Sequence, residues 1–313
     1  MSEIELHRKL LGDTLRNAAF HAALQKVIVP GKSTVADIGA GTGFLSFLAL
    51  KLGARHATLV EYTETLGLAE YLARKNKLTA LTFIRAHSAE VKKPPKADIV
   101  ISETLGNYAL EENLLETLVD ARRYLAPGGV LIPGRLRQFV APVVAPRLQR
   151  ELDVWPQVGY GIDLSAARAV SLNNMYVKAV TPDDLGPAGG APGLWDEIDF
   201  SPAAKAPASQ RSGTVQWRPN DPQVVFGFAL WWECELLPGI VISTSPYAPA
   251  THWEQIYLPL LKPLELAAND TFEVKISSDT RPEAGVRVAW RTRVERGGKN
   301  ITELSQDTLR GRL

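Results

Sequence analysis

The sequence predicts a doubly wound α/β domain followed by an antiparallel β domain. Three observations lead to this prediction. Between residues 34 and 133, short apolar runs alternate with longer helix-like segments. After residue 135, β-branched and aromatic runs follow one another with only turn residues between most of them. A glycine-rich turn also follows the first apolar run, where parallel sheets commonly bind ligands. We place the domain boundary after residue 135, giving domains 1–135 and 136–313.

The α/β domain is predicted from strands and helices that alternate at regular spacing. Glycine at position 53 ends the first helix, and Pro127 with Gly128 ends the last one, because neither residue type favours continuation of a helix. Before the first strand, apolar residues recur at helical spacing over residues 7–24, which predicts an amphipathic helix. The purely structural interpretation is that this helix packs on the sheet with Asp13 and Arg16 as a solvated pair. The strands are expected at 34–38, 57–61, 82–86, 97–103 and 129–132, and the helices between them at 44–52, 64–77 and 114–125.

The second domain is predicted to be an antiparallel sheet or barrel, because no long helical period separates most of its β-rich runs. A stretch at residues 186–208 is rich in Pro, Gly and Ala and is expected to be an exposed loop. The strands are expected at 138–144, 224–232, 239–244, 272–277 and 286–294.

Composition excludes several classes of protein. The chain has 313 residues and is 45% hydrophobic, which is typical of a folded globular protein. Its 35 basic and 34 acidic residues leave a net charge of +1, so no overall field favours nucleic acid or anionic membrane. The single cysteine, Cys234, cannot form an internal disulfide or a thiolate metal cluster. No apolar stretch reaches the roughly 18–20 residues of a membrane span. We therefore expect a cytoplasmic protein without a metal site.

The glycine-rich turn predicts a site for a nucleoside. Its glycines allow a sharp turn and close approach to a ligand. A dinucleotide fingerprint would need glycine where Phe44 stands, and the Gly-Lys pair of a phosphate-binding loop is absent. Glu61 follows at the end of the second strand, where a carboxylate can accept hydrogen bonds from a ribose diol. The pattern resembles that of class I S-adenosylmethionine methyltransferases. The turn contains Asp37, Gly39, Gly41 and Gly43.

Two further motifs contain residues suited to catalysis. Glu103 follows the fourth strand, and Glu112 comes nine residues later. That spacing puts the two carboxylates on opposite faces of a helix or strand, so they converge only if the segment folds back as a loop around Gly106. Alternatively, Glu111 and Glu112 simply begin the helix predicted from residue 114, where acidic residues are favourable. The Thr-His-Trp sequence at 251–253 lies in a Pro-rich loop, where such residues more often serve packing than catalysis.

Taken in order along nearly the whole chain, these motifs resemble the protein arginine methyltransferase family. The resemblance rests on residues 10–16, with Phe20 in place of a family tyrosine, on the two glutamates nine residues apart, and on the Thr-His-Trp loop. Residues 159–164 resemble the segment that leads into the family's dimerisation arm, which is expected at about 165–180. The resemblance implies a Rossmann-like methyltransferase domain, a β-barrel-like domain with an inserted arm, and a homodimer.

The resemblance also implies roles for individual residues. Arg16 would hold the carboxylate of S-adenosylmethionine, and Glu61 would bind its ribose hydroxyls. Glu103 and Glu112 would grip the substrate guanidinium, and Asp13 with His252 would handle the proton. Trp253 and Tyr108 would contact the substrate. The other cofactor contacts would be His7, Asp37, Gly39, Gly41, Gly43, Ser88 and Glu90.

The expected activity is methyl transfer to arginine in proteins or peptides. Free arginine or another small guanidino metabolite stays an alternative, as does a non-catalytic cofactor-binding scaffold. Apart from the glutamate pair, the nearest additional acids are Glu111 and Glu116, which gives little support for docking of a basic peptide. The sequence departs from the family pattern at Thr104, where members usually have a bulky residue, and at Ala89, where many have an acid.

Overall fold

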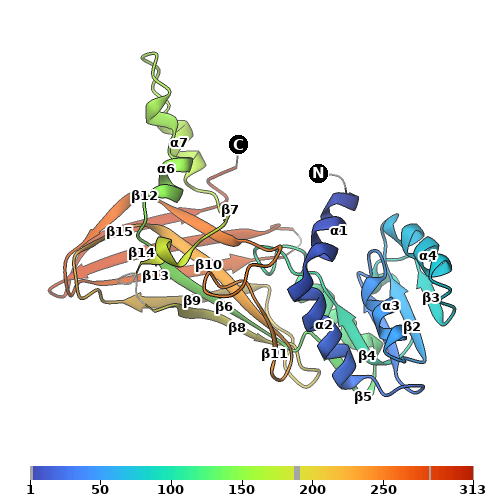
Figure 1. Ribbon diagram of the computed structural model, residues 1–313. Helices are drawn as coiled ribbons and strands as arrows, with labels where there is room; N and C mark the ends of the chain where they lie inside the picture. The colour runs from blue at the N-terminus through green and yellow to red at the C-terminus, as the bar shows by residue number, and fades with distance from the viewer. Residues whose placement is uncertain (1–2, 187–190, 282, 313) are drawn as a thin grey trace.

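The computed structural model describes residues 3–186, 191–281 and 283–312, which form an α/β domain and a β domain side by side (Figure 1). The α/β domain contains a five-stranded parallel sheet with the order β3-β2-β1-β4-β5. Successive strands run outward from β1 on both sides, so the space beyond the carboxyl ends of β1 and β4 is the expected ligand crevice. The strands are β1 Thr34–Ile38, β2 His56–Val60, β3 Leu81–Ile84, β4 Ala97–Ser102 and β5 Leu125–Ile132.

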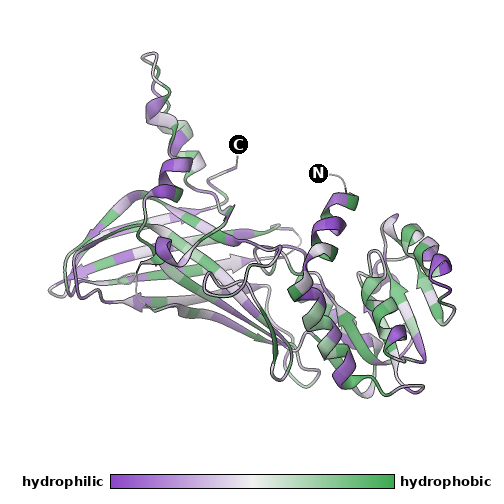
Figure 2. Cartoon of the chain, viewed as in Figure 1, coloured by the Kyte–Doolittle hydropathy of each residue, from purple (hydrophilic) through white to green (hydrophobic). Residues whose placement is uncertain are grey.

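The strands β1 and β2 are buried along almost their whole length, because helices cover both faces of the sheet. Figure 2 accordingly shows α3 and the neighbouring strands as mainly hydrophobic. Two single-turn 3-10 helices, η1 (Ser88–Glu90) and η2 (Arg122–Tyr124), complete the domain. The helices that follow the strands are α3 Phe44–Lys51, α4 Thr65–Lys75 and α5 Leu114–Ala121.

The N-terminal segment forms two helices, α1 (Glu3–Gly12) and α2 (Thr14–Val27), where the sequence predicted one. Asp13 interrupts the helix because its Oδ1 accepts a hydrogen bond from Arg16 N (2.9 Å) and caps α2. The expectation that Asp13 and Arg16 form a solvated pair is wrong, since they are only 7% and 3% exposed. Helical periodicity cannot reveal that both side chains point into a site shared with other segments.

The β domain contains two antiparallel sheets. The first has the order β7-β12-β10-β6-β8, with β11 also paired to β10, and the second has the order β15-β14-β13-β9. The first consists of β6 Arg135–Val143, β7 Tyr176–Lys178, β8 Gly193–Asp199, β10 Gln223–Leu237, β11 Ile240–Ser243 and β12 Gln255–Leu266. The second consists of β9 Gln210–Trp217, β13 Thr271–Asp279, β14 Arg287–Arg296 and β15 Lys299–Asp307.

The edges of the two sheets approach each other, which gives the domain its barrel-like form. On one side, a Cβ at Gly213 of β9 would lie 1.8 Å from the carbonyl oxygen of Trp195 in β8, so only glycine fits there. On the other side, the Gln306 amide of β15 donates to Pro259 O of β12 (2.9 Å). The interior is apolar, with Trp217 stacked on Phe272 at a ring-centroid distance of 5.2 Å. The predicted fold class is confirmed.

Several strands of the β domain were not predicted. The prediction of an exposed loop at 186–208 is wrong for residues 193–199, which form β8. Residues 187–190 of the predicted loop lie outside the described residues. β12 contains two prolines, and β9 and β15 expose polar residues on one face, so none of them has the continuous apolar pattern of a buried strand. Pairing with neighbouring strands stabilises these segments despite their sequence.

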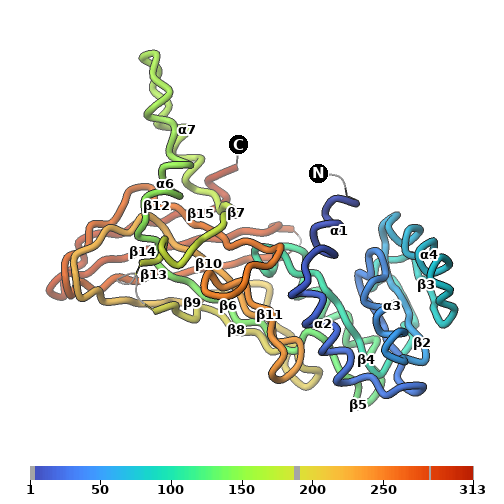
Figure 3. Tube along the Cα trace, viewed as in Figure 1, coloured from blue at the N-terminus to red at the C-terminus, as the bar shows by residue number. Residues whose placement is uncertain are grey.

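A helical segment between β6 and β7 projects away from both sheets (Figure 3). It contains α6 (Arg147–Leu152), η3 (Trp155–Gln157) and α7 (Ser165–Ser171), and Arg168 joins its two halves through hydrogen bonds to both carboxylate oxygens of Asp153 (2.7 and 2.6 Å). The projection therefore starts earlier than the arm predicted at 165–180, and residues 176–178 belong to the sheet as β7. A short helix, α8 (Pro182–Leu185), follows β7.

No helix in the described ranges is long and apolar enough to cross a membrane. Cys234 is buried in β10. Among the same residues, no three His, Cys, Asp or Glu side chains cluster in a way that would hold a metal ion.

Candidate active site

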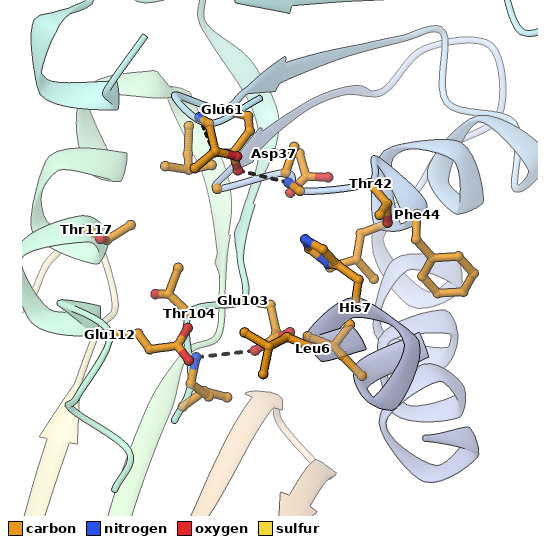
Figure 4. Close-up of a pocket in the computed structure, with 18 of the residues that line it drawn as sticks. Leu6, His7, Asp37, Thr42, Phe44, Glu61, Glu103, Thr104, Glu112 and Thr117 are labelled. Carbon is orange, nitrogen blue, oxygen red and sulfur yellow. Dashed lines mark hydrogen bonds between the residues drawn. The ribbon is translucent and has the colours of Figure 1, made fainter. Parts of the chain in front are cut away.

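A cavity of about 930 Å³ lies where α1, the carboxyl ends of the parallel strands and the loop between β11 and β12 meet. Its volume is in the upper range of small-molecule sites. Figure 4 shows Glu61 and Asp37 on one side of this cavity and Glu103 and Glu112 on the other. The position matches the crevice that the strand order predicts for a ligand.

The glycine turn after β1 forms the floor of the cavity. Gly39 and Gly41 both have positive φ angles (72° and 51°), which other residues rarely adopt. A Cβ at Gly41 would lie 2.7 Å from Cε1 of His7, so the α1 histidine packs directly on the turn. Gly43 differs from the other two because it begins α3 and makes room for Phe47 and Leu59. Gly39 and Gly41 of the turn thus line the cavity together with His7 of α1, whereas Gly43 does not line it and serves packing.

Glu61 is fixed by backbone donors on both sides. Its Oε2 accepts from Gly41 N (3.0 Å) and its Oε1 accepts from Thr63 N (2.8 Å). Each carboxylate oxygen has a second lone pair, so the buried side chain can still accept hydrogen bonds from a ligand in the cavity. Asp37 lies nearby and accepts from Ser46 Oγ (2.8 Å). Burial raises the pKa of Asp37 to about 6, although the bonds from Ser46 oppose this shift.

The wall beyond Glu61 contains residues of β2 and η1. Ser88 and Glu90 were both predicted to contact the cofactor. Ser88 lines the cavity, whereas Glu90 is exposed and does not line it. Tyr62 and His87 also line it, with ring centroids 5.9 Å apart. The sequence analysis did not select these two residues, although their positions directly after Glu61 and before Ser88 are a usable signal.

Arg16 and Glu103 form a buried ion pair at the centre of the site. Arg16 Nε donates to Glu103 Oε2 (3.0 Å), and Nη2 donates to the same oxygen. Nη1 donates to Asn17 Oδ1 (3.0 Å), and the guanidinium lies 5.1 Å from the ring centroid of Phe20. The structure therefore brings together one residue expected to bind the cofactor and one expected to bind the substrate.

The segment from Glu103 to Glu112 folds back as a loop, and both carboxylates line the same cavity. The alternative in which Glu111 and Glu112 start a helix is wrong, because α5 begins only after Asn113, whose φ of 57° reverses the chain. Two tryptophans of the β domain hold the loop. Trp232 Nε1 donates to Gly106 O (3.1 Å), and Trp253 Nε1 donates to Leu105 O (2.7 Å).

Acidic neighbours surround Glu112. Removal from water within the cavity raises its pKa to about 7, and the nearby charges of Glu103 and Glu111 add to this shift. A cation that binds here would relieve the repulsion between the carboxylates. Thr104 lies between the loop and the glycine turn, with Cγ2 3.3 Å from the position of a Cβ at Gly39.

Asp13 joins the start of α2 to the β domain. Its Oδ2 accepts from both His252 N and His252 Nδ1, each at 2.8 Å. Burial raises the pKa of Asp13, but hydrogen bonds from Arg16 N and from His252 outweigh this and hold the pKa below its usual value. Because an ionised carboxylate only accepts hydrogen bonds, the contact with Asp13 places a proton on Nδ1 of His252.

The two residues expected to contact the substrate lie in different places. Trp253 lines the cavity and packs against His252, with ring centroids 3.8 Å apart. Tyr108 is only 2% exposed and points into the β domain, where its hydroxyl donates to Ser278 Oγ (2.6 Å). The structure does not bring Tyr108 to the cavity, because its side chain leaves the loop on the opposite face.

Known proteins match the chain over most of its length. A family model described as the arginine methyltransferase oligomerization subdomain matches residues 137–293, and a methyltransferase domain model matches residues 31–163. Protein arginine N-methyltransferase 6 of Xenopus tropicalis is 30% identical over 298 residues, which cover 90% of this chain and 86% of the relative. The chain belongs to the protein arginine N-methyltransferase family.

Solved structures of arginine methyltransferases share the fold. A chain of the Trypanosoma brucei PRMT1 enzyme–prozyme heterotetrameric complex with AdoHcy superposes with a TM-score of 0.85 at 23% identity, covering 96% of each chain. Arabidopsis thaliana protein arginine methyltransferase 10 gives a TM-score of 0.80 at 20% identity, covering 96% of this chain and 97% of the other. Family membership confirms the predicted activity class, S-adenosylmethionine-dependent arginine methylation.

Proposed function

We propose that this arginine methyltransferase modifies arginine in proteins or peptides, with Glu103 and Glu112 holding the guanidinium. One observation carries the proposal: two carboxylates from a single folded-back loop line the same cavity as the glycine turn and Glu61. The names of the relatives support protein substrates, since two of them, from Xenopus tropicalis and Xenopus laevis, are called protein arginine N-methyltransferase 6.

The residues of the α/β wall fit S-adenosylmethionine. When bound, this cofactor supplies an electrophilic methyl group on a sulfonium. Glu61, already oriented by Gly41 N and Thr63 N, would accept hydrogen bonds from the ribose hydroxyls. Arg16 would bind the amino-acid carboxylate. The remaining proposed contacts are His7, Asp37, Gly39, Gly41 and Ser88, all of which line the cavity.

The paired carboxylates address the main chemical obstacle. A guanidinium has a pKa above about 12, and its delocalised charge makes the nitrogen lone pairs poor nucleophiles. Contacts from Glu103 and Glu112 would concentrate positive charge on the nitrogens that they bind, leaving the remaining nitrogen better able to attack. Holding that nitrogen in line with the methyl group can lower the activation free energy by roughly 7–11 kcal/mol.

His252 is the proposed proton acceptor. Asp13 holds Nδ1–H at 2.8 Å, which leaves Nε2 free to take up the proton that the methylated nitrogen loses. Asp13 then stabilises the imidazolium through the same hydrogen bond. Trp253 would form the adjoining wall for the substrate, since it lines the cavity beside His252.

The decisive experiment incubates the enzyme with methyl-labelled S-adenosylmethionine and, separately, with arginine-rich peptides, histones and free arginine. Acid hydrolysis followed by mass analysis should detect methylarginine from the peptides and histones. Labelling of free arginine alone would support a small-molecule methyltransferase, because the two carboxylates recognise only the guanidinium. Cofactor binding without any labelled product would support the scaffold.

We also propose that the chain forms a homodimer through the projecting segment. Its tip exposes apolar side chains in the single chain, including Tyr160 at 94% exposure, and such patches commonly mark interfaces. Light scattering should give twice the mass of one chain, and Tyr160→Glu should shift the mass toward that of a monomer. A cytoplasmic location stays a proposal that rests on the single buried cysteine, Cys234.

A further inference from the structure

We propose that Glu111 is a positioning residue that fixes the geometry of the guanidinium-binding loop. It does not line the cavity itself, and from the sequence it was only a possible helix start or an additional acid near Glu112. The inference deepens the proposed function, because it assumes that Glu103 and Glu112 bind the substrate. The inference adds that a third carboxylate, that of Glu111, determines the shape of the loop that carries Glu103 and Glu112.

The side chain of Glu111 folds back across the loop. Its Oε1 accepts a hydrogen bond from Asn107 N (2.8 Å), while Glu111 N donates to Tyr108 O (2.9 Å). The side chain also covers Gly106, where a Cβ would lie 2.2 Å from Cγ and 2.5 Å from Cδ of Glu111. The φ angle of Gly106 is not positive, so this position requires glycine mainly because Glu111 occupies the adjacent space.

The residues that Glu111 contacts are the ones that the β domain anchors. Asn107 accepts from Glu254 N through Oδ1 (2.9 Å), and Gly106 accepts from Trp232 Nε1 (3.1 Å). Glu111 therefore connects these anchored residues to Glu112, its direct neighbour in the chain. Removal of its side chain would leave Asn107 N without its acceptor and would open space above Gly106, so that Glu112 could shift away from Glu103.

The charge of Glu111 gives a second, separable effect. Glu112 shares the cavity with Lys9 of α1, Arg16 of α2, Glu103 and His252, and burial, Glu103 and Glu111 together raise its pKa to about 7. A neutral side chain of the same shape at position 111 would preserve the loop but weaken the repulsion. The pKa of Glu112 would then fall, and substrate binding would persist to lower pH.

The test compares Glu111→Ala with Glu111→Gln, which keeps an acceptor oxygen and nearly the same volume. Glu111→Ala should lower kcat/KM for an arginine peptide by about 10- to 100-fold, chiefly through KM. Glu111→Gln should stay within about threefold of wild type at pH 8 and should move the acidic limb of the kcat/KM profile to lower pH. Both variants should bind AdoHcy within about twofold of wild type by calorimetry, as should the distant exposed control Glu265→Ala.

A double-mutant cycle examines the packing on Gly106. Gly106→Ala should impair the wild-type enzyme strongly but should cost at most about threefold in the Glu111→Ala background, because the added methyl group collides mainly with Glu111. The inference would be overturned if Glu111→Ala kept the wild-type kcat/KM, or if it lost AdoHcy binding in parallel. Additive effects of the two substitutions in the cycle would overturn it as well. Failure of the wild-type enzyme to methylate any arginine would instead overturn the proposed function.

Discussion

The two walls of the cavity are stabilised in different ways. On the cofactor side, Glu61 is held by Gly41 N and Thr63 N, which are close to it within the α/β domain. On the guanidinium side, the loop carbonyls of Leu105 and Gly106 accept hydrogen bonds from tryptophans of the β domain. The first wall therefore depends on the folding of one domain, and the second depends on how two domains pack. Substitutions should accordingly separate cofactor binding from substrate binding.

The largest difference between the effect on turnover and the effect on cofactor binding is expected for Glu103→Gln. Loss of one of the two charges that hold the guanidinium should lower kcat by about 100- to 1,000-fold, as removal of a transition-state contact commonly does. Cofactor binding should remain measurable by calorimetry, because Glu61 is untouched and the amide oxygen of glutamine can still accept from Arg16. Joint loss of turnover and of cofactor binding would show that Glu103 is mainly a structural partner of Arg16.

Glu61→Gln should have the opposite effect, weakening cofactor binding more than substrate binding. An amide offers only one acceptor oxygen, so either Gly41 N or Thr63 N would face an NH₂ group and the ribose would lose one of its two acceptor oxygens. We expect Kd for AdoHcy to rise about 10- to 30-fold, in line with loss of a charge-assisted hydrogen bond. The exposed neighbour Glu64→Gln is the matched control and should change Kd less than about twofold. Equal effects of both variants would remove Glu61 from the cofactor site.

Above about pH 6.5, the pH dependence should belong to the guanidinium wall, because Asp37 on the cofactor side has a pKa of about 6. The pKa of Glu112 is raised to about 7, so this carboxylate is ionised above that pH and protonated below it. Since only the ionised form attracts a guanidinium, kcat/KM for a peptide should fall about tenfold for each unit of pH below 7. The Kd for AdoHcy should change much less above about pH 6.5, where Asp37 of the cofactor wall stays ionised. A profile that stays flat down to pH 5.5 would contradict the assignment.

The smallest effect is expected for Trp253→Phe. This change removes the hydrogen bond to Leu105 O (2.7 Å) but keeps most of the aromatic packing beside His252. Loss of one neutral hydrogen bond should raise KM for a peptide by about threefold, with kcat and cofactor affinity nearly constant. A larger change in Kd for AdoHcy than in KM would show that the two walls are not independent.

The same contrast explains what could be predicted from the sequence. Gly39, Gly41 and Glu61 were predictable because their positions follow from strand ends and local backbone requirements. Convergence of Glu103 and Glu112 could not be derived from a spacing of nine residues, and only the family resemblance indicated it. The direction of Tyr108 was not predictable, since irregular loops have no side-chain period.

Other failures have physical causes of the same kind. Periodicity predicted one continuous helix at 7–24 because it does not register that Asp13 caps a new helix. The polar strand β15 and the proline-containing strand β12 were missed because pairing with neighbours outweighs their local sequence. Residues that act between domains, such as Trp232, carry no mark in the sequence that distinguishes them from ordinary core residues.

The buried bond between Tyr108 and Ser278 has a consequence beyond the site. It joins the α/β domain to β13, and the bonds from His252 to Asp13 and from Trp232 to Gly106 cross the same boundary. Melting of one domain would expose these polar groups without partners in the other. The two domains should therefore denature together in a single cooperative transition, and neither should persist as a folded fragment when the other is lost.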